Sequence, residues 1–134
     1  MTENERHWLA GLLQGDGSFT MINAGTMRGR GYKRVRSTAY VCLEMSEDEL
    51  DVVERAATLM CAPSAYRYPP RQRTRFPNAK GTARAQVGGE KAVRLMRDLY
   101  PLLGSRRRAR IDEILAACDP DGTRYAARTK EEAA

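Results

Sequence analysis

Apolar positions along the chain recur at two spacings, one typical of helices and the other typical of strands. Residues 2–14 follow the helical spacing, and Thr2 and Glu5 stand at the distance expected of an N-terminal capping box. Residues 18–24 and 35–45 instead alternate apolar and polar side chains, as half-buried strands do. A stretch rich in glycine and arginine separates the two runs, so together they predict a β-hairpin.

A similar pattern returns in the middle of the chain. Ser46 and Glu49 have capping-box spacing and precede a helical pattern that ends near Cys61. Prolines interrupt the next stretch, so the strand predicted at about 64–75 is short or irregular. Residues 82–87 then alternate small or apolar residues with polar ones, which predicts a fourth strand.

The C-terminal part contains one interrupted helical region. Helical spacing starts near Gly89, breaks between Pro101 and Gly104, and continues to the end of the domain. The element order is therefore α-β-β-α-β-β-α, in a single α+β domain over residues 1–118. Residues 119–134 are expected to form a C-terminal turn and a mobile tail.

Composition narrows the class of protein. The 134 residues are 42% apolar and 30% charged, which is typical of a globular domain. No apolar run approaches the ~18 residues of a membrane-spanning helix, and the N-terminus lacks the basic and apolar segments of a secretion signal. Three separated cysteines predict neither a disulfide framework nor a zinc site, and a single histidine excludes a His-rich site within one subunit. We therefore expect an intracellular protein in a reducing compartment.

Positive charge gathers in particular segments of the chain. The net charge is +6, and residues 63–110 hold thirteen cations against two acids. Polar and cationic side chains also occupy one face of the predicted strands, and such a surface could fill a DNA groove. The bland alternative is a solvated surface rich in arginine, so charge alone leaves both interpretations open.

The N-terminal helix ends in a distinctive motif. Residues 9–17 read Leu-Ala-Gly-Leu-Leu-Gln-Gly-Asp-Gly, and Ser-Phe follows. This segment resembles the signature of the LAGLIDADG homing endonucleases, and the element order resembles the family fold over about residues 5–118. Leu13 stands for the usual isoleucine, and Gln14 departs from the usual aspartate. Taken alone, Gly-Asp-Gly also fits an ordinary turn at the end of a helix.

The resemblance implies a fold and an assembly. The fold is an α+β LAGLIDADG homing-endonuclease-like fold, in which a curved antiparallel four-stranded sheet forms a DNA-binding saddle. Relatives with one motif are homodimers that pair through the motif helix. Gly11 and Gly15 lie four residues apart on one helix face, where small residues let a second helix approach closely. The dimer interface expected on this basis comprises Trp8, Gly11, Leu12 and Gly15.

The resemblance also implies the chemistry of the site. Asp16 of each subunit would hold two or more shared Mg²⁺ ions beside the two-fold axis, together with the backbone carbonyl of Gly15. Glu47 matches a polar position that organises water near the scissile phosphate, although an acid in the first turn of a helix is also favoured by the helix dipole. Arg106, where relatives often have lysine, would stabilise charge on the phosphate, with a solvated charge run as the alternative.

The function implied by the resemblance is that of a site-specific homing endonuclease, which serves intron or intein mobility. Such an enzyme would make a double-strand cut in a long pseudo-palindromic DNA target by Mg²⁺-dependent phosphodiester hydrolysis. The polar sheet face and the basic loops would contact the double-stranded DNA. The expected DNA-binding residues are Ser18, Thr20, Ile22, Ala24, Arg28, Arg30, Lys33, Arg34, Arg36, Thr38, Tyr40, Glu44, Arg71, Arg73, Arg75, Arg84, Gln86 and Arg108.

Two other functions stay open on the sequence alone. The same fold could serve a non-cleaving DNA-binding repressor or an RNA-splicing maturase, in which case RNA would be a partner. Asp16 argues against a pure binding protein, because a binder has no need of a carboxylate that faces phosphate. A basic interaction module of an unrelated α+β fold is the remaining alternative.

Overall fold

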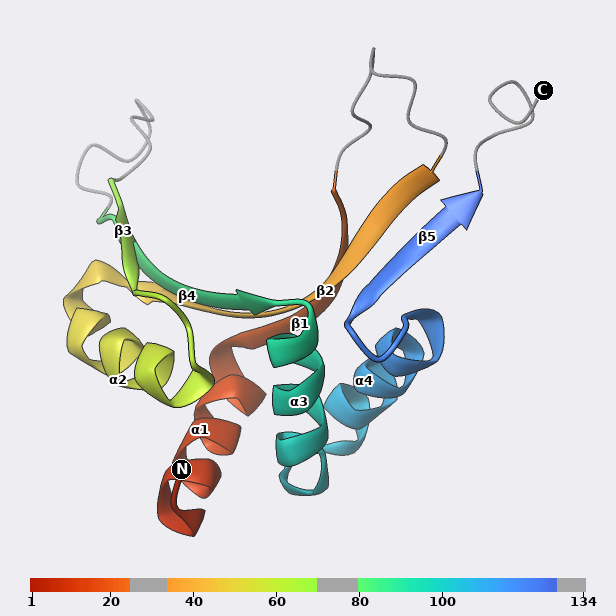
Figure 1. Ribbon diagram of the computed structural model, residues 1–134. Helices are drawn as coiled ribbons and strands as arrows, with labels where there is room; N and C mark the ends of the chain where they lie inside the picture. The colour runs from red at the N-terminus through yellow and green to blue at the C-terminus, as the bar shows by residue number, and fades with distance from the viewer. Residues whose placement is uncertain (25–33, 70–79, 128–134) are drawn as a thin grey trace.

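The computed structural model describes residues 1–24, 34–69 and 80–127, and these alternate helices with strands (Figure 1). The elements are α1 (Glu3–Asp16), β1 (Gly17–Ala24), β2 (Arg34–Ser46), the 3₁₀ turn η1 (Glu47–Glu49), α2 (Leu50–Met60), β3 (Tyr66–Tyr68), β4 (Thr82–Gly88), α3 (Glu90–Leu99), the 3₁₀ turn η2 (Tyr100–Leu102), α4 (Ser105–Ala117) and β5 (Thr123–Ala127).

One curved sheet separates the molecule into a covered side and an open side. Its antiparallel strands follow the order β1-β2-β4-β3, and β5 also pairs with β2. The helices α1 to α4 all lie against the same face of this sheet, and none of the described residues covers the opposite face, here called the open face (Figure 1). No helix in the described part of the chain is long and apolar enough to cross a membrane. The α+β class and the curved four-stranded sheet predicted from the sequence are thereby confirmed.

Strand alternation sends apolar side chains to the helical side. Val41 and Leu43 of β2 are fully buried, and so are Ala83 and Ala85 of the neighbouring strand β4. The helices contribute the remaining large side chains of the core, among them Leu9, Leu13, Val53, Met60, Met96, Leu99, Ile111 and Ile114. Small alanines in the sheet leave room for these bulky helical residues, so the two layers pack closely.

The start of α1 forms as the sequence predicts. The Thr2 hydroxyl accepts a hydrogen bond from the Glu5 amide at 3.1 Å, and the Glu5 carboxylate accepts one from the Thr2 amide at 2.8 Å. The hydrogen bond from the Thr2 backbone amide to the Glu5 carboxylate, and next to it the Thr2 hydroxyl, hold the pKa of Glu5 below its usual value. The reciprocal pair satisfies two amides that a helix start otherwise leaves without partners.

The second capping box is a wrong prediction. The Ser46 hydroxyl accepts from the Asp48 amide at 3.4 Å, not from Glu49, and α2 begins only at Leu50. The reason lies in the sheet, where β2 stays paired with β4 as far as Ser46 and the Glu47 amide donates to the Gly81 carbonyl at 2.9 Å. The chain therefore leaves β2 through a tight 3₁₀ turn before the helix starts.

The C-terminal segment adds a fifth strand. The turn expected after residue 118 is present, but residues 123–127, expected to lie in a mobile tail, form β5 beside the first half of β2. Gly122 has φ +76°, and a Cβ there would meet the Gly89 carbonyl oxygen at 2.3 Å. Glycine at this position lets β5 continue the row that β4 begins along β2. The rest of the expected tail, residues 128–134, lies outside the described residues.

Candidate functional site

Asp16 stands at the corner where α1 meets the sheet. It is the last residue of the helix, and the next amide, that of Gly17, closes the helix by donating to the Leu13 carbonyl. The Asp16 side chain is exposed and has no hydrogen-bond or ion-pair partner among the described residues. A solvated carboxylate without an internal partner is free to bind a ligand from outside the chain.

The end of α1 favours a cation beside this carboxylate. The last carbonyls of a helix have no partner within the helix, and they form the negative pole of the helix dipole. Gly15 and Asp16 occupy this position, so their carbonyl oxygens and the Asp16 carboxylate offer the hard oxygen ligands that Mg²⁺ prefers. Among the described residues of one subunit, no three His, Cys, Asp or Glu side chains are grouped as metal ligands.

The helix face that contains Gly11 and Gly15 is open. Both residues are exposed, and a Cβ added to either would meet no atom within 4 Å. Leu12 is half-buried against the core, and Trp8 lies under the Arg55 guanidinium, which is 4.2 Å from the ring centroid. The residues expected at a dimer interface therefore form a face with two exposed glycines at its centre and apolar side chains beside them.

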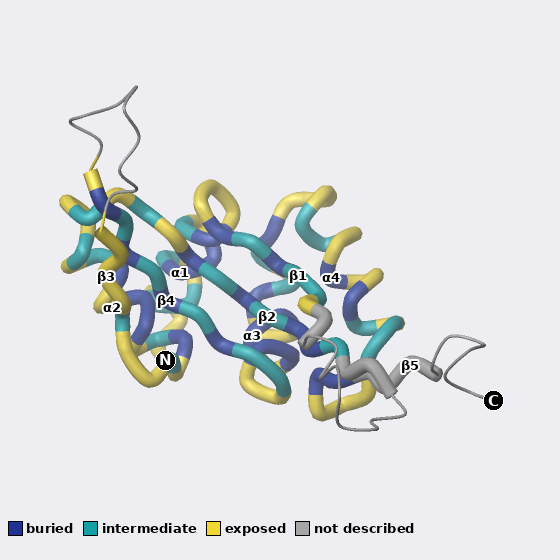
Figure 2. Tube along the Cα trace, turned by 90° about the horizontal axis from the view of Figure 1, so that it is seen from above, coloured by how far each residue is buried: buried dark blue, intermediate teal, exposed yellow. Residues whose placement is uncertain are grey.

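The open side of the sheet is polar. Neighbouring strands place Ser18 beside Cys42, which is beside Gln86, and the next row places Thr20 beside Tyr40. Seen from above, buried positions alternate along β4 with half-buried ones (Figure 2). Half-buried or exposed residues from the sequence prediction that share this face are Ser18, Thr20, Ile22, Tyr40, Glu44, Arg84 and Gln86. Thr38 shares the face but is buried, at 6% exposure, so its position does not favour direct contact with a ligand.

A charged and aromatic cluster lies toward the β3 end of the open face. Arg84 donates to Glu44 through Nε at 2.9 Å, and this hydrogen bond raises the pKa of Arg84. The guanidinium carbon also lies 5.0 Å from the Tyr68 ring centroid. Tyr66 pairs with Arg84 in register, and Tyr66 and Tyr68 are 48% and 43% exposed. The residues predicted to contact DNA do not include these two tyrosines, although the Tyr-x-Tyr spacing within the predicted third strand already places both on one face.

Glu47 lies at a different corner of the sheet, at the end of β2. Its Oε2 is 3.5 Å from Nη2 of Arg67 on β3, and the Glu47 side chain is 30% exposed. A Cβ at Gly81 would come within 2.8 Å of the same oxygen, so glycine makes room for the carboxylate. Nearby, Lys80 forms an ion pair with Asp48. Unlike Asp16, Glu47 therefore has a cationic partner within its own chain.

Arg106 belongs to the first turn of α4, which carries a run of cations. Its side chain is exposed and has no hydrogen-bond or ion-pair partner among the residues that the structure describes, whereas the guanidinium of the neighbouring Arg107 lies 5.9 Å from the Phe19 ring centroid. Arg108 is half-buried. Free amides of a helix start and adjacent guanidinium groups both attract anions, which suits this turn to phosphate. No hydrogen bond or ion pair joins Asp16, Glu47 and Arg106 to one another within the described chain.

Several predicted contacts fall where the structure gives no side-chain detail. Ala24, Arg34 and Arg36 belong to β1 and β2, where Ala24 and Arg36 are partners in register, but only their backbone is described. The predicted contacts in the two loops lie outside the described residues, and these are Arg28, Arg30, Lys33, Arg71, Arg73 and Arg75.

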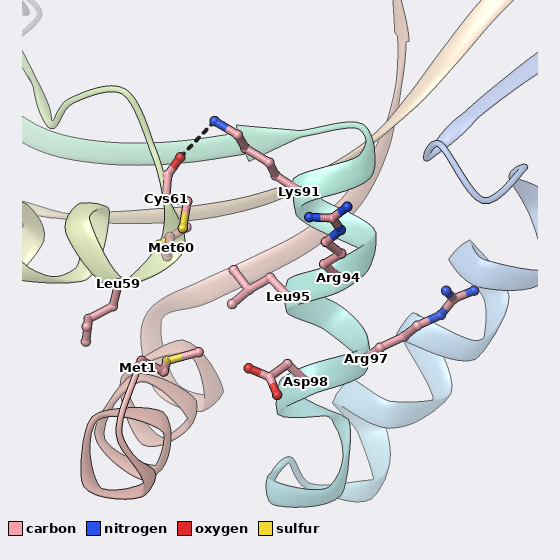
Figure 3. A pocket seen from close by; sticks show the side chains of 9 residues that line it. All are labelled: Met1, Leu59, Met60, Cys61, Lys91, Arg94, Leu95, Arg97 and Asp98. Carbon is pink, nitrogen blue, oxygen red and sulfur yellow. Dashed lines mark hydrogen bonds between the residues drawn. The ribbon is translucent and has the colours of Figure 1, made fainter.

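A pocket of about 600 Å³ lies on the helical side, away from these residues (Figure 3). It is bounded by Met1, the end of α2 and the α3 residues from Lys91 to Asp98. Lys91 Nζ crosses it to donate to the Cys61 carbonyl at 3.2 Å, and Arg94 pairs with Glu90 at 2.6 Å. None of the residues predicted for catalysis or DNA contact lines this pocket, so it is not part of the candidate site.

Solved structures similar to this chain are homing endonucleases. I-CvuI, in complex with the I-CreI target in the presence of Mg²⁺, aligns with a TM-score of 0.61 and 16% identity, over 86% of this chain and 66% of that chain. The group I intron-encoded enzyme I-CeuI, complexed with DNA, gives 0.58 and 11%, over 87% and 54%. An archaeal intron-encoded homing endonuclease complexed with DNA gives 0.55 and 12%, over 86% and 69%.

These alignments bear on the fold. The chain spans between about half and about two thirds of the length of the solved structures named above. No family model and no curated protein matches the sequence. The similarity of structure at low identity confirms the fold that the motif and the element order predict.

Proposed function

Because the protein has the fold of the LAGLIDADG homing endonucleases, we propose that it is a homodimeric, Mg²⁺-dependent, site-specific DNA endonuclease. The observation that supports this proposal most directly is Asp16, an exposed carboxylate at the end of the motif helix that has no partner among the described residues. A purely structural acid at a helix end would be expected to have a partner or to lie in the first turn, where the dipole favours it.

A second copy of the chain would complete the site. Gly11 and Gly15 leave open space on α1, so an identical helix can pack against them around a two-fold axis. This arrangement brings Asp16 of one subunit near Asp16 of the other, at the negative poles of two helices. Two facing carboxylates, one from each subunit, offer a divalent ion more ligands than either chain does alone.

The residues of this chain divide the chemistry between them. Asp16 and the Gly15 carbonyl would hold Mg²⁺, which in hydrolysis of this kind lowers the pKa of water and stabilises the leaving oxygen. Glu47 would orient water near the scissile phosphate, with its charge balanced by Arg67. Arg106 would bind a non-bridging phosphate oxygen at the start of α4, where developing negative charge is stabilised by a cation and by helix amides.

The substrate would be a long pseudo-palindromic duplex that lies on the open face of the sheet. Side chains such as Arg84, Glu44 and Gln86 offer donors and acceptors to base edges, and guanidinium groups in the loops would contact phosphates. Such binding weakens steeply with salt, because each neutralised phosphate releases counterions. The proposal extends to intron or intein mobility and to a location inside the cell, where such a target lies.

A cleavage selection tests this function. Wild type and Asp16→Asn are incubated with Mg²⁺ on DNA libraries that include randomised palindromes, and the new ends are sequenced. Glu54→Gln is the matched control, since it removes one exposed carboxylate from α2, on the helical side. We expect wild type and Glu54→Gln to cut one related set of sites and Asp16→Asn to bind them without cutting.

Other outcomes of the selection separate the alternatives. Sequence-specific retention of uncut DNA by wild type would favour a repressor, and retention of RNA would favour a maturase. Loss of folding or of the dimer in Asp16→Asn, measured by circular dichroism and sedimentation, would make Asp16 structural and remove the proposed site. A monomer with no affinity for DNA would contradict the whole proposal.

A further inference from the structure

One side chain of the motif helix reaches across to the helix that carries Arg106. Gln14 lies two residues before Asp16, and its Oε1 accepts a hydrogen bond from the Gly104 amide at 2.8 Å. Gly104 is the N-cap residue of α4, which has no side-chain cap of its own. A Cβ at Gly104 would meet Oε1 and Nε2 of Gln14 at 3.4 Å each, so the two groups are in close contact. Residues ninety positions apart thus join the end of α1 to the start of α4.

Phe19 forms a second connection between the same two regions. Its carbonyl accepts from Nε of Arg110 at 3.2 Å, and the Arg107 guanidinium lies 5.9 Å from its ring centroid. Asp16 therefore lies in sequence between Gln14 and Phe19, two positions that contact α4 or its N-cap residue. Arg106 lies in sequence between Gly104 and Arg107, which contact Gln14 and Phe19 respectively. The acid and the cation are each bracketed by these contacts, although no direct bond joins them.

We propose that Gln14 is a positioning residue, which sets the start of α4, and with it Arg106, relative to Asp16. The inference rests on the proposed endonuclease function and deepens it. An amide side chain suits this task, because its oxygen accepts the Gly104 hydrogen bond as a carboxylate oxygen would. It also explains how the chain tolerates glutamine at a motif position where aspartate is usual. Catalysis depends on such placement, since a displacement of about 1 Å can cost about 100-fold in rate.

A double-mutant cycle tests the proposal. Gln14→Leu removes the acceptor at similar size, Gln14→Glu keeps an acceptor, and Arg106→Ala removes the cation. Single-turnover cleavage at saturating enzyme is measured for each variant and for Gln14→Leu combined with Arg106→Ala. We expect Gln14→Leu to slow cleavage by about 10- to 100-fold with little change in the dissociation constant for DNA. Gln14→Glu should stay within a few-fold of wild type, and the double variant should be no slower than Arg106→Ala alone.

A second measurement keeps the test independent of activity. Hydrogen exchange of the Gly104 amide, followed by NMR, should accelerate in Gln14→Leu and stay slow in Gln14→Glu. If Gln14→Leu does not fold, Gln14→Ala replaces it, since alanine is the residue most compatible with a helix.

Particular results would overturn the proposal. Additive losses in the cycle would show that Gln14 does not act through Arg106. Gln14→Leu could lower the melting temperature and still cleave at the wild-type rate when assayed well below that temperature. This result would show that Gln14 contributes to stability alone. If wild type cleaves no DNA, the proposed function fails. Hydrogen exchange then tests the contact between Gln14 and the Gly104 amide by itself. Unchanged exchange of the Gly104 amide in Gln14→Leu would refute that contact.

Discussion

Alternate residues of the same strands build the two faces of this sheet, yet the faces differ in almost every property. Along β2, Val41 and Leu43 point to the helices and are fully buried, whereas Tyr40, Cys42 and Glu44 lie on the open side. Backbone hydrogen bonds serve both faces equally, so side chains alone create the difference. One face gains its free energy from burial on folding, and the other keeps polar groups at the surface, where an external partner can reach them.

The comparison teaches that stability and recognition can be separated by single residues. A substitution on the helical face should change the free energy of unfolding and affect DNA only through folding. A substitution on the open face should change DNA binding and leave unfolding nearly unaffected. The following experiments test that separation, starting with the largest effect.

Leu43→Ala should produce the largest change. Leu43 is fully buried at the centre of the sheet, so truncation leaves a cavity and should lower the free energy of unfolding by about 2–5 kcal/mol. Urea unfolding followed by circular dichroism measures it. Gln86→Ala is the matched control on the open face, and its effect should stay within about 0.5 kcal/mol. Equal losses of unfolding free energy in the two variants would mean that the open face contributes to stability as much as the helical face does.

Arg84→Gln should weaken DNA binding by a smaller amount. The change removes a guanidinium that Glu44 and Tyr68 hold in place on the open face, so we expect to lose about 1–3 kcal/mol of affinity for the selected target. Binding is measured by fluorescence anisotropy at fixed salt. Arg94→Gln removes the same charge from an ion pair with Glu90 on the helical side, and it should change affinity much less. A larger loss of DNA affinity in Arg94→Gln than in Arg84→Gln would indicate that DNA binds the helical side and not the open face.

The pair formed by Glu47 and Arg67 should have a weaker effect still. Arg67→Gln leaves the Glu47 carboxylate without its cation next to the expected path of the phosphates, so DNA affinity should fall by up to about 1 kcal/mol. Adding Glu47→Gln to Arg67→Gln should restore most of that loss, because no uncompensated negative charge then remains. Lys80→Gln, which disrupts the neighbouring pair with Asp48, is the control. Failure of the second substitution to restore binding would show that Arg67 contacts DNA in its own right.

Local signals in the sequence predicted most of the fold. The capping box at Thr2, the alternation along β2 and β4, and the break at Pro101 each act within a few residues, and each element formed as predicted. The motif also predicted the place of Asp16 in the fold, because a helix end is set by the residues next to it.

Features that depend on distant pairing could not be predicted in this way. Ser46 failed to cap α2 as predicted because pairing with Thr82 keeps it in the sheet. β5 depends on a register with β2 that only the folded chain defines. The same holds for the partners of Glu47 and Gln14, which are Arg67 and the Gly104 amide. Sequence spacing carries no information about such contacts across the fold.

The smallest expected effect concerns the cysteines. Cys42 is half-buried in the open face, and burial is the main cause that raises the pKa of its thiol, whereas Cys61 is exposed at the end of α2. A raised pKa leaves less thiolate at a given pH, and the thiolate is the form that reacts. Near neutral pH, iodoacetamide should therefore label Cys61 faster than Cys42, and labelling of Cys42 should accelerate as the pH rises.

Bound DNA sharpens that difference. A duplex on the open face would cover Cys42 and slow its alkylation several-fold further, while Cys61 on the helical side would react at an unchanged rate. Mass spectrometry of tryptic peptides measures both rates in one sample, so Cys61 serves as the internal control. Protection of Cys61 without protection of Cys42 would reverse the assignment of the two faces, because the bound DNA would then lie against the helices.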